Sequence, residues 1–365
     1  MASVGSLFKA KRRDIDMTEG SIFSNLIRFA FPLLLGNLFQ QLYNLVDTWV
    51  IGRTGENGAF AAVGSVGPII NILIGFFLGL SSGAGVVISQ YYGAKDEEKV
   101  RRAVHTSVMM TLILGVIFTV VGIAMTPWIL RLMLRTSGGG NEIYEFARSY
   151  LTIYFAGVIG LMIYNIGAGI LRAIGDSQHP FVFLLVSAIS NIALDLLFVF
   201  GFDMGVVGVA LATVISQALS AFLTVIVLVR TPTSVRVSLR QLRIDREMLG
   251  SIIRIGIPAA IQLAITSFAN VFVQSYIANV DANQTHVMSG WTAYSKIDQF
   301  IFLPLQSLAL AATTFVGQNL GKGNVARAKK GTLVAYLMAT VSAVALIGLI
   351  EIFAPYVVPI INSDP

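Results

Sequence analysis

The sequence of 365 residues has no cysteine and little charge. Without cysteine it forms no disulfide bond and no thiolate metal site. Only 12% of the residues are Asp, Glu, Lys or Arg and 55% are hydrophobic, whereas soluble domains carry about 25% charged residues. Neither an H-E-x-x-H zinc motif nor a P-loop occurs, which excludes that class of metalloprotease and an ATP-driven motor in this chain. The composition is that of an integral membrane protein.

One enzyme-like motif is present, and its context argues against catalysis. Residues 79–83, GLSSG, match the G-x-S-x-G pattern of serine hydrolases. That pattern needs a strand–turn–helix elbow and a histidine within reach of the serine. Here it lies inside a hydrophobic run, and His105, His179 and His286 lie in loops or at the ends of such runs. Small residues for close helix packing explain it better, so we predict that the protein is not an enzyme.

Long apolar runs dominate the chain. A membrane-spanning helix needs about 20 mainly apolar residues, and nine runs have this length. The predicted spans are residues 29–51, 59–83, 103–126, 148–171, 181–200, 206–229, 251–277, 288–316 and 331–353. The first run is too long for the core of a signal peptide and is not followed by a small-residue cleavage site, so it is a permanent span. The sequence predicts an all-α, polytopic helical bundle.

Positive charge is distributed unevenly between the two sides of this bundle. If the chain crosses the membrane nine times, 20 of the 25 Lys and Arg residues fall on the side of the N-terminus. By the positive-inside rule, that side is cytoplasmic. We therefore predict a multi-pass protein of the plasma (inner) membrane with a cytoplasmic N-terminus.

The longest polar connection, residues 231–250, divides the chain. Its sequence, TPTSVRVSLRQLRIDREMLG, alternates Val or Leu with Arg, which predicts a segment lying on the anionic inner leaflet. A nucleic-acid site is the rival interpretation of such a stretch, and a loop of a membrane protein disfavours it. The predicted organisation is an N-lobe of six spans (1–230), a basic cytoplasmic linker (231–250) and a partial C-lobe of three spans (251–365), with membrane lipids but no nucleic acid as partners.

The two lobes contain an internal repeat. A shift of 226 residues aligns LIRFAFPLLLGNLFQQLYNLVDTWVIG with IIRIGIPAAIQLAITSFANVFVQSYIA, and a shift of 228 aligns ISQYYGAKDEEKVRRA with VGQNLGKGNVARAKKG. The matched positions are mostly polar, Gly or Pro: Arg28 with Arg254, Pro32 with Pro258, Asn44 with Asn270, Gln90 with Gln318, and Gly93 with Gly321. An even number of spans, six, separates the copies, so both enter the membrane in the same direction. Parallel repeats of this kind are a transporter architecture.

Polar residues inside the apolar runs form one candidate ion site. An intramembrane carboxylate such as Asp47 is costly unless it is paired or solvated, so it is by default a functional hypothesis. Asn191 and Asp195, four residues apart, share one helix face, and Thr213 supplies a hydroxyl in the next span. Oxygen ligands suit a hard cation, and two nearby carboxylates share either a sodium ion or a proton. The alternative is that the two acids only join helices through hydrogen bonds.

These segments resemble the multidrug and toxic compound extrusion (MATE) family. The resemblance rests on FAFPLLLGNLFQQLYNLVDTWVIG, on the paired ISQYYGAKD and VGQNLGKGN segments, and on NIALDLLFVF, and it covers the chain from about residue 18 onward. It implies two six-helix lobes that exchange cationic or amphipathic drugs for sodium ions or protons. Nine spans instead of twelve predict a chain truncated after the ninth helix, with self-association as one way to complete the bundle.

The resemblance also assigns the ion site. In the branch typified by the DNA-damage-inducible transporters, the positions matching Asp47, Asn191, Asp195 and Thr213 form a cation site in the N-lobe. The norfloxacin-transporter branch uses a carboxylate of the seventh span, and here the seventh span has none. The predicted site is therefore the N-lobe site, with sodium or a proton as coupling ion and no other cofactor.

Further residues are predicted to line a drug path or to move. Pro32 is a candidate hinge of the first span, or only a static bend. Cavity candidates are the polar side chains within the spans, each of which is as suited to bonding a neighbouring helix: Asn37, Gln40, Asn44, Asn165, Gln217, Asn270, Gln274, Lys296 and Asp298. The first three recur with Asp47 at helical spacing, as a polar stripe.

The predicted function is secondary active multidrug efflux. A flippase for lipid-linked oligosaccharides is the alternative within transport. It needs cationic side chains in the cavity, and in the interiors of the predicted spans, away from their ends, only Lys296 is basic. A non-transporting scaffold or fragment is the alternative from another class.

Overall fold

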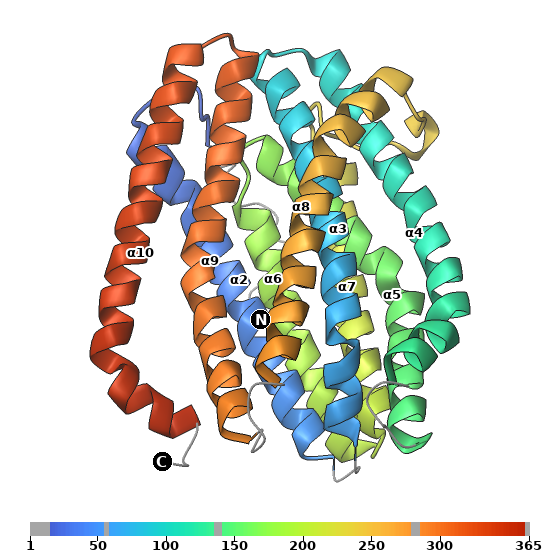
Figure 1. Ribbon diagram of the computed structural model, residues 1–365. Helices are drawn as coiled ribbons and strands as arrows, with labels where there is room; N and C mark the ends of the chain where they lie inside the picture. The colour runs from blue at the N-terminus through green and yellow to red at the C-terminus, as the bar shows by residue number, and fades with distance from the viewer. Residues whose placement is uncertain (1–14, 55–57, 135–140, 279–284, 362–365) are drawn as a thin grey trace, which may run out of the picture.

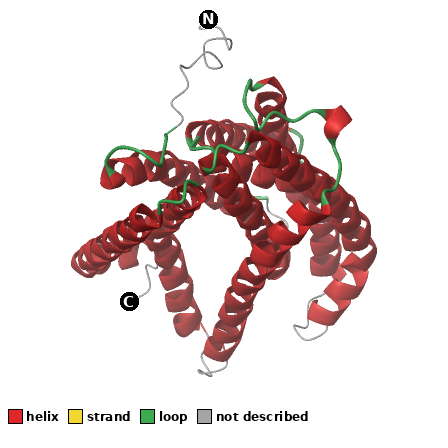
Figure 2. Cartoon of the chain, turned by 90° about the horizontal axis from the view of Figure 1, so that it is seen from above, coloured by secondary structure: helices red, strands yellow, loops and turns green. Residues whose placement is uncertain are grey.

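The computed structural model describes residues 15–54, 58–134, 141–278 and 285–361, without the side chains of 132–134, 141, 271, 274–275, 278, 285–297 and 353–361. Every regular element in these ranges is helical, and nine helices are long and apolar enough to cross a membrane (Figures 1 and 2). They are α2 (Ile22–Gly52), α3 (Ala59–Gly93), α4 (Glu97–Leu134), α5 (Asn141–Ala173), α6 (Gln178–Asp195), α7 (Gly205–Arg230), α8 (Arg246–Ala278), α9 (Thr285–Gly321) and α10 (Val325–Ile361). A π-helical segment, η1 (Leu196–Gly201), continues α6, and a short 3₁₀ helix, η2 (Leu239–Gln241), lies in the linker. The predicted all-α polytopic bundle is confirmed.

Eight of the nine helices are longer than the apolar runs that predict them, and α6 exceeds its run only together with η1. The 38 residues of α4 correspond to about 57 Å at 1.5 Å per residue, and the hydrocarbon core of a bilayer is about 30 Å thick. The polar ends of the helices therefore project beyond the hydrocarbon. Large exposed apolar side chains, such as Trp128 and Phe222, cover the flanks, as contact with lipid requires.

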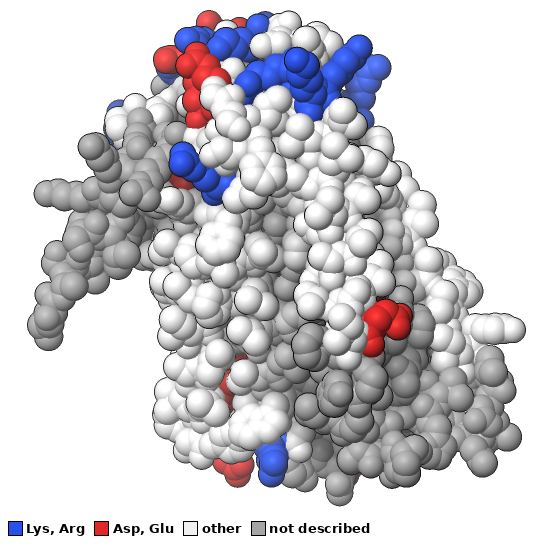
Figure 3. All heavy atoms as spheres, turned by 90° about the vertical axis from the view of Figure 1, so that its left-hand side faces the viewer, with Lys and Arg blue, Asp and Glu red and all other residues white. Residues whose placement is uncertain are grey.

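Basic side chains gather at one end of the bundle, which we call the basic end (Figure 3). At this end α3 turns into α4 and α9 turns into α10, through residues 94–96 and 322–324. Both turns carry lysine, Lys95 and Lys322. The same end carries the 231–245 connection and the segment that precedes α2. The charge asymmetry predicted from the sequence is thus a property of the folded molecule.

The two lobes meet along α3. Helices α2–α7 form the N-lobe and α8–α10 the partial C-lobe, and α3 packs against both α8 and α9. Glycine makes this approach close: a Cβ placed on Gly83 would lie 2.6 Å from the Cα of Gly256, and one on Gly79 would overlap the backbone of Ala260. Small residues let helix backbones approach where lipid provides no hydrophobic driving force. We call this contact of α3 with α8 and α9 the seam.

Equivalent residues of the two repeats contact one another reciprocally in the seam. A Cβ on Gly93 would clash with the carbonyl oxygen of Gln318. A Cβ on Gly321 would clash with the carbonyl oxygen of Gln90. Because Gly93 corresponds to Gly321 and Gln90 to Gln318, these are one contact made twice, which is the signature of a two-fold relation. The repeat read from the sequence is therefore present in three dimensions, with both copies in the same direction.

The repeat axis passes between residues that correspond to each other. Ser89 and its counterpart Gly317 face one another, so that a Cβ on Gly317 would clash with the Ser89 hydroxyl. Backbone conformation is shared too, since Lys95 has φ 60° and its counterpart Gly323 has φ 79°. Both residues end a helix in the left-handed region, where glycine is usual and lysine is uncommon.

Part of the linker packs on the protein. Val235 and Val237 are buried in the apolar core of the N-lobe, while Arg236 between them is exposed. Leu239 is also exposed, and the prediction that this segment lies on the inner leaflet stays a prediction. The connection is also shorter than predicted from the sequence, since α8 begins at Arg246.

Candidate functional site

The four residues predicted to bind a cation come together inside the N-lobe. Asp47 lies near the end of α2, Asn191 and Asp195 share one face of α6, and Thr213 lies on α7. The Asp47 carboxylate interacts with the other three side chains. Asn191 and Asp195 are 0% exposed and Thr213 is 6% exposed. The structure therefore forms one small polar cluster from three helices that are apolar along most of their length.

The local backbone presents Asp195 at a break in helix geometry. Asp195 is the last residue of α6, and the chain continues as the π-helix η1. A π-helical turn widens the helix and is frequent at functional sites. The turn after it closes through the N–H of Phe202, which donates to the Leu197 carbonyl at 3.0 Å. The carboxylate thus lies where the regular α-helical ladder stops.

Most polar side-chain atoms of the cluster have no hydrogen-bond partner in the protein. Within the described residues, five buried atoms of the cluster lack one: Asp47 Oδ1, Asp195 Oδ1 and Oδ2, and Asn191 Oδ1 and Nδ2. The Thr213 hydroxyl donates to the Val209 carbonyl at 3.0 Å, which directs its lone pairs elsewhere. Buried polar groups without partners are costly. A cation or a proton between the two carboxylates would remove that cost.

The donor set indicates what such a site can hold. It offers two carboxylates, one amide oxygen and one hydroxyl, all oxygen ligands, which suit a hard cation such as Na⁺. Alternatively the two carboxylates share one proton and titrate as a pair. Among the described residues no group of three or more His, Cys, Asp or Glu could hold a metal ion, so a transition-metal site is not what this cluster resembles.

Tyrosines surround the carboxylate pair, and sequence reasoning missed them. Tyr150 on α5 is close to both Asp47 and Asp195, and Tyr43 on α2 is close to Asp47. Tyr154, one turn after Tyr150, completes this group. All three are less than 9% exposed. The signal was available as the i, i+4 spacing of Tyr150 and Tyr154, but tyrosine is so common in membrane helices that the spacing alone does not mark a site.

Two predicted cavity residues border this cluster. Gln40 interacts with Tyr43, and Gln217 interacts with Tyr154. Both are only partly buried. They connect the carboxylate pair to the less buried part of the N-lobe.

The remaining cavity candidates lie elsewhere. Asn37 donates to the Ser307 hydroxyl of α9 at 3.4 Å, across the lobes. Asn44 is exposed and donates to Gln41 Oε1 at 3.4 Å. Asn165 donates to the Leu161 carbonyl of its own helix at 2.8 Å. The stripe expected on α2 is therefore divided between the ion cluster, the other lobe and the surface.

Two of the four C-lobe candidates have described side chains, and neither is fully buried. Asn270 is exposed and Asp298 is partly buried. The side chains of Gln274 and Lys296 lie outside the described part of the structure. Pro32 lies within α2, which runs unbroken from Ile22 to Gly52, and its role as a hinge stays a prediction.

Comparison with known proteins places this architecture in a family. The MatE family model matches residues 32–197 and 258–365, so the unmatched interval contains the linker. The probable multidrug resistance protein YoeA of Bacillus subtilis is 32% identical over 355 residues, which cover 95% of this chain and 75% of YoeA. The multidrug export protein MepA of Staphylococcus saprophyticus is 30% identical over 262 residues, 71% of this chain and 57% of MepA.

Solved structures agree. A crystal structure of MATE in complex with MaL6 has a TM-score of 0.90 at 28% identity, covering 97% of this chain and 77% of that one. A MOP superfamily transporter from Pyrococcus furiosus gives a TM-score of 0.89 at 28% identity, with the same coverage. From the matched repeat, the shared fold and these relatives, the chain belongs to the multidrug and toxic compound extrusion (MATE) family of transporters.

Proposed function

We propose that this chain exports small amphipathic cations in exchange for a sodium ion or a proton bound at Asp47, Asn191, Asp195 and Thr213. The observation that carries the proposal is the group of three buried carboxylate oxygens without a hydrogen-bond partner, Asp47 Oδ1 and both oxygens of Asp195, in a membrane-spanning lobe. Charge in that environment is expensive and functional by default. The relatives named multidrug export and resistance proteins give the substrate class.

The ion site favours the DNA-damage-inducible branch of the family. Its carboxylates belong to α2 and α6, both in the N-lobe. In α8, residues 248–278 contain no Asp or Glu, so the seventh-span site of the other branch has no ligand here. We infer that coupling takes place in the N-lobe alone.

Ion binding drives export only by differential affinity. A ligand shifts a conformational equilibrium no further than the difference between its affinities for the two states. The cluster joins α2 to α6 and α7, so an ion that draws these helices together stabilises one arrangement of the N-lobe. The uncovered carboxylates of the other arrangement attract a cationic drug electrostatically. Ion and drug would then leave on opposite sides.

Efflux measurements test the function directly. Ethidium-loaded bacteria without their own drug pumps, expressing this chain, should lose ethidium faster than cells with an empty vector. The rate should depend on external sodium or on pH, whichever ion couples. Equal rates from both cell types, with the protein present in the membrane, would contradict the proposal.

Orientation follows from the basic end. We propose that it faces the cytoplasm of a bacterium, because Lys and Arg are retained on that side of the inner membrane. Since the chain has no cysteine, an introduced cysteine is the only thiol of the variant, and its labelling shows on which side of the membrane that residue lies. A maleimide that cannot cross membranes should label K99C only in inverted vesicles and E145C only in intact cells. Both side chains are at least partly exposed, and the opposite pattern would reverse the assignment.

A further inference from the structure

Each lobe is entered through a segment that crosses to the other lobe at the basic end. Strap one is residues 15–20, which lead into α2 of the N-lobe. Strap two is residues 235–245, which lead into α8 of the C-lobe. In the repeat alignment α2 corresponds to α8, so the two straps occupy corresponding places in the chain.

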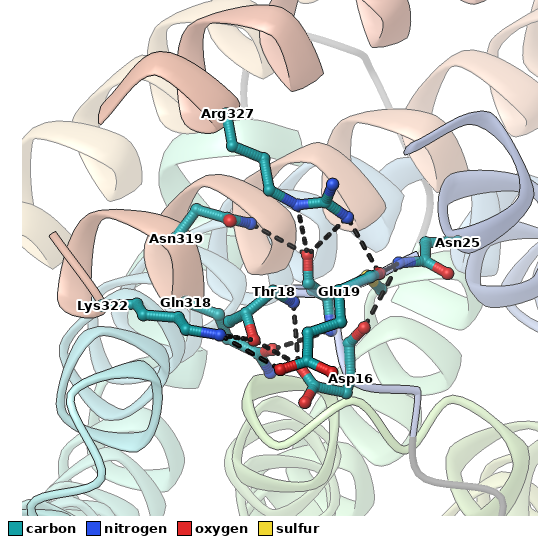
Figure 4. A network of polar contacts seen from close by, with 9 residues as sticks. Asp16, Thr18, Glu19, Asn25, Gln318, Asn319, Lys322 and Arg327 are labelled. Carbon is teal, nitrogen blue, oxygen red and sulfur yellow. Dashed lines mark hydrogen bonds and ion pairs between the residues drawn. The ribbon is translucent and has the colours of Figure 1, made fainter. Parts of the chain in front are cut away.

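Strap one is bound by α9 and α10 through its backbone (Figure 4). The Met17 N–H donates to Gln318 Oε1 at 3.2 Å, and the Met17 carbonyl accepts from Asn319 Nδ2 at 3.0 Å. Arg327 of α10 donates to the Glu19 carbonyl at 2.8 Å. The Met17 side chain is 0% exposed, in an apolar cluster with Phe315. The C-lobe thus binds this short segment through both hydrogen bonds and apolar packing.

Gln318 joins strap one to both lobes at once. Its side chain accepts from Met17 and donates to the Ala173 carbonyl at the end of α5, at 2.8 Å. The strap itself reaches the same loop, since the Ile15 N–H donates to the Gly175 carbonyl at 3.2 Å. Gln318 is 1% exposed and belongs to the seam. Separating the lobes here breaks this network.

Strap two is bound by α4 of the N-lobe. Arg102 forms ion pairs with Asp245 at 2.7 Å and with Glu247 at 2.9 Å. The Asp245 N–H donates to the Thr106 hydroxyl at 3.1 Å. His105, which is 2% exposed, accepts the N–H of Ser238 at its Nε2 at 3.1 Å. Helix α4 is the counterpart of α10, so the exchange between the lobes is reciprocal.

Strap one has space beside it in which to move. A cavity of about 300 Å³ is lined by Asp16, Thr18 and Gln318, together with Lys95 from the α3–α4 turn and Ser234 from the linker. Ser234 is the residue directly before strap two. A segment with a cavity on one side detaches with less steric hindrance than one packed on all sides.

We propose that the two straps form a paired latch, which holds the lobes together at the basic end and has to release on both sides before the seam opens there. The latch is a property of the fold. Only its consequence for transport rests on the proposed function.

Two of the latch carboxylates, those of Asp245 and Asp16, have lowered pKa values. Hydrogen bonds from the Met248 N–H and from Arg102 hold the pKa of Asp245 below its usual value of 3.8. Burial raises the pKa of Asp16, but hydrogen bonds from Thr18 and the charges of Lys322 and Lys95 outweigh it, so that this pKa is lowered as well. A depressed carboxylate pKa stabilises the fold above the usual pKa, and the contribution is lost as the pH falls through the lowered value. We therefore expect Asp16 and Asp245 to stay charged between about pH 5 and 8.

Thiol labelling tests the latch without any transport. Ser89 is 0% exposed in the seam, so the S89C variant carries a single thiol that reacts only when the seam opens. Arg102→Gln and Arg327→Gln, which weaken one strap each, should each raise the rate of maleimide labelling about threefold. The two together should raise it tenfold or more. Arg148→Gln, which breaks an ion pair within α5, should leave the rate unchanged.

Equal labelling of S89C with and without both latch substitutions would overturn the proposal. If S89C folds poorly, Q90C at the neighbouring, half-buried seam position replaces it as the labelled residue. Faster labelling with both Arg substitutions would support the latch, and equal labelling would overturn it.

Cross-linking connects the latch to transport. In E19C/K322C, a pair 3.3 Å apart as an ion pair, a short thiol-cleavable cross-linker should reduce efflux at least tenfold, with recovery after reduction. The same reagent on E145C/R148C, within one helix, should have no effect. Undiminished efflux after complete cross-linking of E19C/K322C would refute a latch that releases. If no variant transports but labelling still responds to the Arg substitutions, the latch holds and the proposed function fails.

Discussion

Asp47→Asn and Asp195→Asn should each reduce ion-coupled efflux to the level of the empty vector. The amide keeps the size of the side chain and removes its charge, so a cation between the two residues loses one of its two anionic ligands. Removing one partner of a buried charge pair costs about 3–5 kcal/mol, and each 1.4 kcal/mol is a factor of ten. The affinity for the coupling ion should therefore fall by roughly 100-fold or more, as measured by sodium- or proton-dependent efflux.

Stability should change in the opposite direction. Three of the four carboxylate oxygens of the pair are buried without a hydrogen-bond partner within the described residues, so neutral amides relieve an electrostatic cost and the detergent-solubilised variants should unfold at equal or higher temperature. This readout separates a lost ion site from a misfolded protein. Asp203→Asn is the matched control, because Asp203 is exposed with φ 54°, a conformation that asparagine also accepts. Normal efflux by Asp47→Asn at every pH and sodium concentration would refute the site.

Gly93→Ala and Gly321→Ala should destabilise the protein strongly. The added methyl groups would meet backbone carbonyl oxygens, of Gln318 and Gln90 respectively, and backbone in two packed helices moves far less easily than a side chain. Overpacking costs about 1–3 kcal/mol, which exceeds the gain of about 1 kcal/mol that alanine brings over glycine in a helix. The unfolding temperature in detergent should fall, and efflux should fall with it because the lobes no longer fit at the basic end.

The control for this prediction lies on the same helix. Gly64 and Gly67 of α3 have nothing within 4 Å of an added Cβ. Gly64→Ala and Gly67→Ala should therefore leave the unfolding temperature unchanged or raise it. A fall of the same size in these controls would show that α3 needs glycine for its backbone and not for the seam.

The cluster of Asp47, Asn191, Asp195 and Thr213 was predictable from the sequence because polar and acidic residues stand out in hydrophobic runs. A carboxylate such as Asp47, or an amide and an acid four residues apart such as Asn191 and Asp195, is conspicuous in a hydrophobic run. To predict that three helices bring these residues together, one must also know the fold. The repeat and the family resemblance indicated that fold. The four members of the cluster were thus predictable residue by residue.

Other features were not predictable, for physical reasons. Helical spacing gives the face on which Asn37 lies but not the neighbour that the face meets, which is Ser307 of the other lobe. The alternation around Val235 and Val237 is the same for a segment on a lipid surface and for one inserted into a protein core. Strap one has no periodic pattern at all, since its backbone, with Met17 at the centre, makes most of the contacts.

The reciprocal glycine contacts also bear on how such a chain arises. In a symmetric dimer, a residue of one subunit contacts a second residue of its partner, and the same two residues meet again with the subunits exchanged. The glycine contacts follow this pattern. The seam therefore has the form of a homodimer interface whose two halves have become one polypeptide. The halves have since diverged in chemistry, because the repeat counterpart of Asp47 is Val273. The symmetric joint is present in both copies and the acid at position 47 in one, so the proposed ion site uses only one half of a symmetric scaffold.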